Sequence, residues 1–76
     1  MVQLVSVNYK SENRLANLLA TKKYLGIKVV DAKHMVQCSP CVITFDKPKV
    51  IESRFNLDAL KQKLESFEIE ITTINN

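Results

Sequence analysis

The residues best placed to do chemistry are two cysteines that enclose a serine and a proline, Cys38-Ser39-Pro40-Cys41. A redox dithiol needs a thiolate that is stabilised by a helix N-terminus or by nearby cations. The residues that follow Cys41, Val-Ile-Thr-Phe, are typical of a strand, so no helix dipole is expected to point at the sulfurs. We interpret the motif as a turn and not as a redox centre, and a reversible disulfide remains an open alternative.

A histidine four residues before the first cysteine raises the question of a metal site. His34, Cys38 and Cys41 offer three soft ligands. In an extended strand four residues span about 13 Å, which is too far for one coordination sphere. The chain has no second histidine and no third cysteine to complete a structural zinc site. The sequence therefore predicts no metal and no cofactor.

Other catalytic arrangements are also poorly supported by the sequence. His34 is the only histidine, so no serine has a histidine and an acid to activate it in the usual arrangement. Glu68 and Glu70 share one face of a predicted strand, but no second lobe is expected that would close a cleft over them. The single glycine rules out a glycine-rich phosphate loop. We predict that the protein is not an enzyme.

Length and composition predict one small globular domain over residues 1–76. The hydrophobic fraction is 46% and the formal net charge is +3, which allows an acidic partner without requiring one. The longest apolar runs are about five residues, far short of the roughly 20 that cross a bilayer. The first residues lack the features of a signal peptide. We therefore expect a cytoplasmic protein that makes no contact with a membrane.

The hydrophobic patterns predict six elements that would carry these residues. Ser11 is the expected N-cap of the first helix, in which Leu15, Leu18, Leu19 and Leu25 repeat at helical spacing, and Gly26 is its expected end. Asn56 is the expected N-cap of the second helix. Strands are expected on either side of the helices and between them, at residues 2–9, 27–37, 41–45 and 68–74.

This β-α-β-β-α-β order predicts an α+β, ferredoxin-like two-layer sandwich, with a four-stranded antiparallel sheet and two helices on one face. RNA-recognition motifs share the same order, and their third strand carries aromatic rings on which bases stack. Pro40 and Val42 stand at the upstream stacking positions here. The likeness is therefore one of architecture alone.

The uncovered face of such a sheet is the first candidate for function. Strand alternation predicts an aliphatic surface there, of the kind that marks interaction sites. We expect a small non-catalytic adaptor or regulator that binds a protein partner, or a second copy of itself, through this face or through an edge strand. The expected partner-binding residues are Leu4, Val29, Met35, Val42 and Thr44.

Nucleic-acid binding is the alternative hypothesis. Basic residues occur in the predicted first helix and in the loop after the third predicted strand, and such residues could contact phosphates. The candidate residues are Lys22, Lys23, Lys47, Lys49 and Arg54. Salt dependence would separate the two hypotheses, because phosphate contacts weaken steeply with ionic strength and aliphatic contacts do not.

Overall fold

A computed structural model describes residues 2–51 and 55–75 of the chain. It contains six elements in the order strand, helix, helix, strand, helix, strand. Their bounds are β1 (Val2–Tyr9), α1 (Arg14–Leu25), α2 (Val29–Val36), β2 (Cys41–Val50), α3 (Leu57–Glu65) and β3 (Ile69–Asn75).

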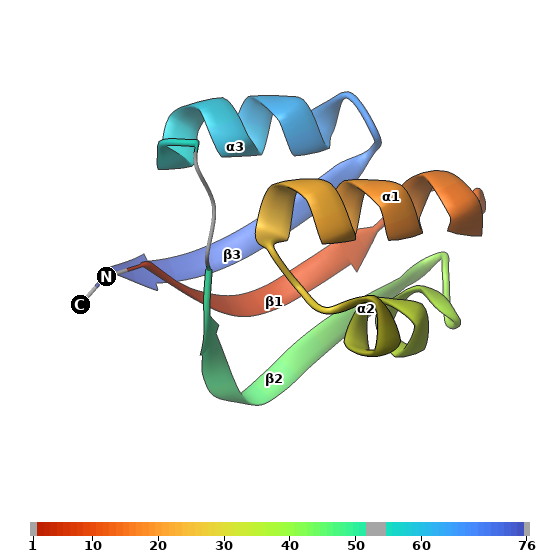
Figure 1. The fold of residues 1–76 in the computed structure, drawn as a ribbon, viewed down its shortest axis with the longest axis horizontal. Coiled ribbons are helices and arrows are strands. Elements are labelled where there is room, and N and C mark those ends of the chain that lie inside the picture. The colour runs from red at the N-terminus through yellow and green to blue at the C-terminus, as the bar shows by residue number, and fades with distance from the viewer. Residues whose placement is uncertain (1, 52–54, 76) are drawn as a thin grey trace.

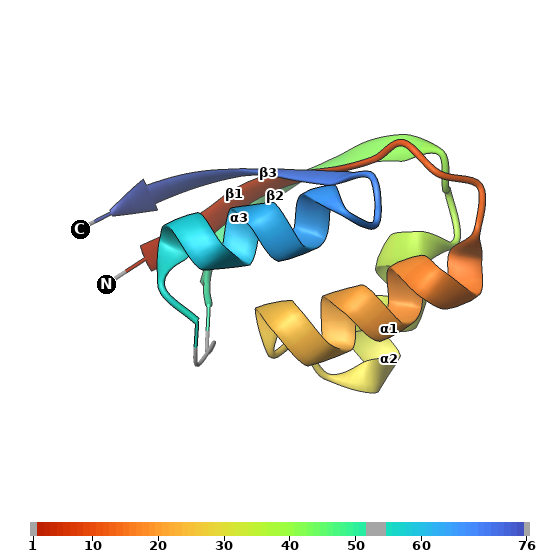
Figure 2. The same cartoon turned by 90° about the horizontal axis from the view of Figure 1, so that it is seen from above.

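The three strands form one antiparallel sheet in the order β2-β1-β3, so that the first strand of the chain lies in the middle (Figure 1). All three helices lie on the same face of this sheet, and the other face is left without helices (Figure 2). The core lies between the two layers and is built from the inward side chains of the sheet and from the buried faces of α1, α2 and α3. The fold is therefore a two-layer α+β domain.

Local signals in the sequence account for several element boundaries. Gly26 ends α1 with a φ of 65°, a left-handed conformation that a residue without Cβ adopts with little strain. Asn56 begins α3, where its Oδ1 accepts a hydrogen bond of 2.8 Å from the Ala59 amide. The N-cap of α1 is Asn13 instead of the predicted Ser11, and the Ser11 hydroxyl accepts from the Asn13 amide. The predicted ends of β1 are confirmed.

The predicted strand over residues 27–37 is wrong, because this segment forms α2. Its first residues, Ile-Lys-Val-Val, are β-branched and favour a strand. The residues that follow are better helix formers, and Ala32, Met35 and Val36 follow one another at spacings of three and one, so that all three face the core. Asp31 lies in the first turn, where the helix dipole favours a negative charge.

Loss of that strand overturns the ferredoxin-like prediction. In the described residues the sheet has three strands instead of four, and three helices instead of two pack on it. The first crossover from β1 to β2 contains a pair of helices, α1 and α2, which pack against each other. The third predicted strand is longer than expected: β2 runs on to Val50 and includes Pro48, which an edge strand tolerates because its amide side can face water.

An irregularity in β1 changes which side chains face the core. The register with both neighbouring strands shifts between Leu4 and Ser6. Against β3, Val5 is an extra residue of β1, whereas against β2 the extra residues are 45–48 of β2. Leu4 consequently points inward and is 1% exposed, although strand alternation from the sequence predicts that it points outward. Val7 and Tyr9 also point inward and are fully buried.

The described helices are short. The longest, α1, has 12 residues. None of the helices in residues 2–51 and 55–75 combines the length and apolarity that a bilayer crossing requires.

Candidate functional site

Helix α1 buries polar residues and exposes leucines. Its inward side presents Asn17, Ala20 and Thr21, all of which are buried. Leu15 and Leu19 are 66% and 56% exposed. The predicted apolar stripe of this helix therefore does not supply its main packing face. Two large apolar side chains four residues apart on an exposed helix face are adjacent, so they form a continuous apolar surface.

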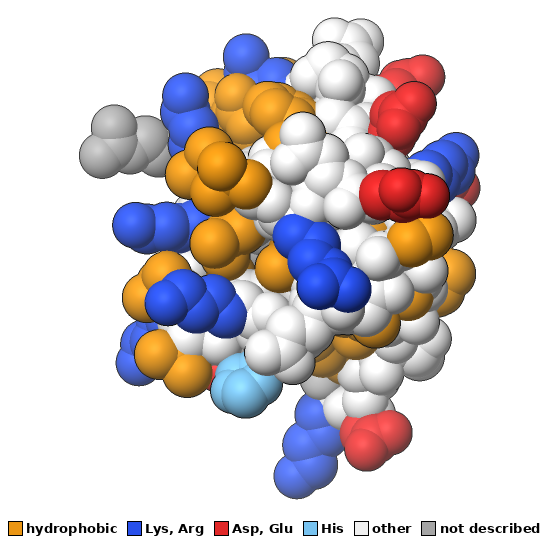
Figure 3. Space-filling view, turned by 90° about the vertical axis from the view of Figure 1, so that its right-hand side faces the viewer, with side chains coloured by type: hydrophobic (Ala, Val, Ile, Leu, Met, Phe, Trp, Pro, Cys, Tyr) orange, Lys and Arg blue, Asp and Glu red, His pale blue; other side chains and the backbone are white. Residues whose placement is uncertain are grey.

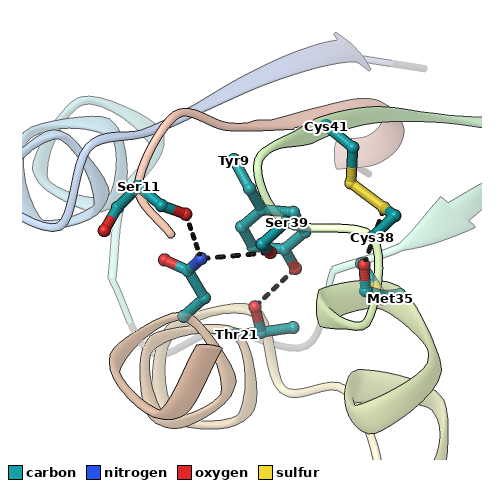
Figure 4. The surroundings of a disulfide bond; sticks show 8 residues. Tyr9, Ser11, Thr21, Met35, Cys38, Ser39 and Cys41 are labelled. Carbon is teal, nitrogen blue, oxygen red and sulfur yellow. Dashed lines mark hydrogen bonds between the residues drawn. A yellow bond between two sulfur atoms is a disulfide. The ribbon is translucent and has the colours of Figure 1, made fainter. Parts of the chain in front are cut away.

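The inward polar residues of α1 are held by buried hydrogen bonds (Figure 4). The hydroxyls of Tyr9 and Thr21 share a hydrogen bond of 2.6 Å. Asn17 Nδ2 donates to the Ser11 carbonyl oxygen at 3.0 Å and to the Ser39 hydroxyl at 3.2 Å. These contacts fix the rotation of α1, because turning the helix to bury the leucines would take Asn17 and Thr21 out to water. The buried hydroxyls of Tyr9 and Ser39 would then lose these partners.

The outward face of α1 also carries positive charge. The helix contains Arg14, Lys22 and Lys23 and has no acidic residue. At 100° per residue, Leu15, Leu19 and Lys22 fall within about 60° of one another, and Lys23 lies next to Leu19. Figure 3 shows hydrophobic and basic side chains interleaved over the side of the molecule where the helices lie, whereas most acidic side chains in this view lie on the sheet side.

A groove of about 580 Å³ opens beside this stripe. Its lining comes from the second half of α1 and from the turn between α3 and β3. We call it the α1 groove and define it by Leu19, Ala20, Lys22, Lys23, Tyr24 and Phe67.

Two aromatic rings, those of Tyr24 and Phe67, line one side of the α1 groove. The ring centroid of Tyr24 lies 5.9 Å from that of Phe67 and 5.5 Å from that of Phe55. Lys23 Nζ lies 5.4 Å from the Tyr24 centroid, and Lys63 Nζ lies 5.0 Å from the Phe55 centroid. Rings held by mutual packing and flanked by ammonium groups give a rigid apolar surface with a positive rim.

The two cysteines are joined by a disulfide in this structure, with a Cα–Cα distance of 5.6 Å. The bond links the residues after α2 to the start of β2, and Cys38 Sγ lies 3.5 Å from the Met35 carbonyl oxygen (Figure 4). The sulfurs thus follow the C-terminal end of a helix. This end carries partial negative charge, which disfavours a thiolate.

No metal-binding group forms around His34. The residue lies on the exposed side of α2. Within residues 2–51 and 55–75, no three His, Cys, Asp or Glu side chains lie close enough together to hold an ion.

The residues predicted for partner binding do not share one surface. Leu4 and Met35 are buried in the core, and Val29 lies at the start of α2 on the helical side. Val42 and Thr44 do lie exposed on the open face of the sheet. The structure therefore brings only two of the five together.

The open face is mainly polar, contrary to prediction. The registers of β1 with β2 and β3 place its side chains in three cross-strand rows. Hydroxyl and amide groups occupy the centre of each row, and valine or isoleucine occurs only at the sheet margins. The rows are Val42-Asn8-Glu70, Thr44-Ser6-Thr72 and Val50-Gln3-Ile74.

The residues predicted for nucleic-acid binding are also dispersed. Lys22 and Lys23 line the α1 groove, whereas Lys47 and Lys49 lie on β2. Lys49 Nζ is 3.3 Å from a carboxylate oxygen of Asp31. Arg54 lies outside the described residues.

An ion pair marks the opposite margin of the sheet. Lys10 Nζ lies 2.9 Å from a carboxylate oxygen of Glu70, and both side chains are more than half exposed. The hydrogen bond to Lys10 lowers the pKa of Glu70, and the same bond raises the pKa of Lys10. Because water screens the pair, it contributes little to stability.

The sequence did contain a signal for the α1 groove. Lys22 falls within the predicted apolar stripe of α1, which is unusual for a buried face. The polar residues Asn17 and Thr21, four apart, define the opposite side of the same helix. No family model, curated protein or solved structure matches this chain.

Proposed function

We propose that the protein is a small non-catalytic adaptor that binds a protein partner through the outward face of α1 and the α1 groove. The observation that carries this proposal is the orientation of α1, which buries Asn17 and Thr21 and exposes Leu15 and Leu19. A soluble domain gains nothing in its own stability from two exposed leucines. A partner that covers them would gain about 1.5–3 kcal/mol for each side chain it fully buries.

The chemistry of the surface specifies the partner. Apolar residues in the α1 groove require an apolar anchor, and Lys22 and Lys23 at its rim favour carboxylates around that anchor. An amphipathic acidic helix meets both needs, since leucines on one face can enter the groove while glutamates face the lysines. We therefore propose an acidic, leucine-bearing helical segment as the ligand.

Fluorescence anisotropy with a labelled peptide tests the proposal. The probe is an amphipathic helix of about 16 residues built from Leu and Glu, long enough to be partly helical in water. Leu19→Gln keeps a good helix former and removes the apolar contact, so we expect about tenfold weaker binding. Val42→Thr removes similar apolar character from the open sheet face and should leave the affinity within about twofold.

Charge reversal provides the second arm of the experiment. The double change Lys22→Glu and Lys23→Glu should weaken peptide binding, most strongly at low ionic strength where screening is least. Lys47→Glu on β2 is the control for charge reversal away from the groove. It changes the net charge half as much as the double change does, and it should have much less than half of the effect. If Leu19→Gln binds the peptide as well as the unchanged protein does, the α1 groove is not the site.

Nucleic acid remains the alternative partner, and the same variants distinguish it. Binding of labelled single-stranded DNA with a steep salt dependence, lost on reversal of Lys22 and Lys23 but kept in Leu19→Gln, would replace the protein-binding proposal. A cytoplasmic location is part of our proposal as well. It requires that the Cys38–Cys41 bond form only transiently there, because cytosolic thiols are kept reduced.

A further inference from the structure

The outer edge of β3 has backbone groups that point away from the sheet. The Lys10 amide donates to the Glu68 carbonyl oxygen at 3.0 Å, and the next facing residues in the ladder are Tyr9 and Ile69. Bonded and non-bonded pairs alternate along antiparallel strands. The amide and carbonyl groups of Ile69 and Ile71 therefore point away from β1, and the pleat gives Thr73 the same direction.

Nothing in the described part of the chain pairs with this edge. β3 is the last strand in the order β2-β1-β3, and residues 2–51 and 55–75 provide no fourth strand. The side chains of Ile69 and Ile71 are nearly fully buried beneath the helices, so the strand is firmly anchored while its outer backbone remains open. An open strand edge is a template for pairing with another extended chain.

The two edges of the sheet differ in how they discourage pairing. The second half of β2 carries Asp46, Lys47, Pro48 and Lys49. Charged residues and proline at an edge strand disfavour pairing with another strand. β3 has the sequence Ile-Glu-Ile-Thr-Thr-Ile-Asn, with one charged residue and no proline. Pairing is therefore permitted at β3 and opposed at β2.

A groove of about 620 Å³ runs beside this edge and is lined mainly by residues of α3, of β3 and of the turn between them. Ile69 and Ile71, whose backbone groups point outward, are among its lining residues. The charged lining consists of three glutamates and two lysines: Glu65, Glu68, Glu70, Lys10 and Lys61. Glu70 is already paired with Lys10, so the groove presents a slight excess of negative charge to an incoming strand.

We propose that β3 and α3 form a second binding site, which accepts an extended basic peptide as an added strand. The peptide backbone pairs with Ile69, Ile71 and Thr73, and its lysine or arginine side chains lie near Glu65 and Glu68. The site is separate from the α1 groove. A protein with both sites can hold two partners at once.

The test uses a labelled peptide of alternating valine and lysine, with about eight residues, and two N-methylated forms of it. One form carries methyl groups on the valine nitrogens and the other carries them on the lysine nitrogens. In an added strand, amides that face β3 alternate with amides that face solvent. We expect one methylated form to lose binding and the other to keep it, and equal affinity of the two forms would overturn the proposal.

Protein variants locate the peptide on the molecule. Thr73→Pro removes an outward donor without removing a bond to β1, so peptide affinity should fall at least threefold, by roughly the value of one hydrogen bond. Thr72→Val is the control, because the Thr72 side chain lies on the open face and its backbone faces β1. Replacing lysine by glutamate in the peptide should abolish binding, and retention of the glutamate form would contradict the charge argument.

Two further outcomes keep this site distinct from the α1 groove. Leu19→Gln should leave binding of the basic peptide unchanged, and Thr73→Pro should leave binding of the acidic helix unchanged. Sedimentation of the protein alone checks for a second copy as the occupant. A dimer that dissociates in Thr73→Pro would assign the edge to self-association and overturn the peptide proposal.

Discussion

At the scale of single residues, the central feature is the buried hydroxyl of Tyr9. The side chain is fully buried, and its hydroxyl shares a hydrogen bond of 2.6 Å with Thr21. Burial raises the pKa of Tyr9 above its ordinary value of 10.0, and the bond to Thr21 opposes this in part. The residue links the middle strand of the sheet to the inward face of α1, so it helps to hold the leucines of α1 outward.

This pKa shift predicts a loss of stability at high pH. Because the folded pKa is the higher one, the contribution of neutral Tyr9 is fully present below pH 10 and is lost as pH rises through the folded pKa. Tyr9→Phe should cost about 1–2 kcal/mol at pH 7, because Thr21 loses its partner. The same substitution should also reduce the further loss of unfolding free energy between pH 9 and about pH 11.

Urea unfolding of both proteins across this pH range measures the effect. Lysine deprotonation is common to the two proteins, so the difference between them isolates the tyrosine. Equal alkaline losses in the two proteins would show that Tyr9 ionisation does not control stability there.

At the scale of elements, the end of α3 has an unusual residue. Glu68 has a φ of 60°, in the left-handed region where side chains with a Cβ are strained. Gly26 holds the corresponding conformation at the end of α1 with little strain. The Glu68 carboxylate lines the groove beside β3, so the sequence retains a charged side chain at a position where glycine would fit the backbone better.

Replacing this residue should therefore stabilise the fold. We expect Glu68→Gly to raise the free energy of unfolding by about 0.5–1 kcal/mol, since relief of strain exceeds the added freedom of the unfolded chain. Glu68→Ala removes the same carboxylate but keeps the Cβ, so it should give no such gain. Thermal unfolding followed by circular dichroism compares the three proteins, and a less stable glycine variant would refute the strain argument.

At the scale of the whole molecule, the helices form one layer and the sheet forms the other. The layers bury Leu4 between them and leave Val42 62% exposed on the far side of the sheet. Charge differs between the two proposed sites, because α1 has basic residues and no acidic one, while the groove beside β3 is lined by three glutamates and two lysines. The two proposed sites therefore have opposite charge preferences, which reduces competition between their ligands.

A pair of aspartate substitutions tests this layer arrangement. Leu4→Asp places a charge in the core and should unfold a domain of this size, since the cost exceeds about 3–4 kcal/mol. Val42→Asp faces water and should change stability by less than about 0.5–1 kcal/mol. Circular dichroism and urea titration give both values. Similar losses in the two variants would mean that the sheet has no open face.

The sequence alone determined the elements whose signals are local. The β-branched residues of β1, Gly26 at the end of α1 and Asn56 at the start of α3 act through neighbouring backbone groups, so their effects are readable without a fold. The turn at Cys38–Cys41 was also readable, because Pro40 fixes φ and removes a backbone donor. The prediction for residues 27–37 was wrong because the β-branched residues at the start of this segment favour a strand. The short helix that forms there is stabilised mainly by packing, which the sequence pattern does not record.

Only the tertiary structure decided which faces of these elements are buried. The residue of β1 that is extra relative to β3 reverses the strand alternation, so Leu4 turns into the core. The rotation of α1 depends on Ser39 and Tyr9, which are distant in sequence from the Asn17 and Thr21 that they contact. Sequence patterns record the hydrophobicity of each side chain but not its long-range partners, and those partners placed the candidate site on the helices instead of on the sheet.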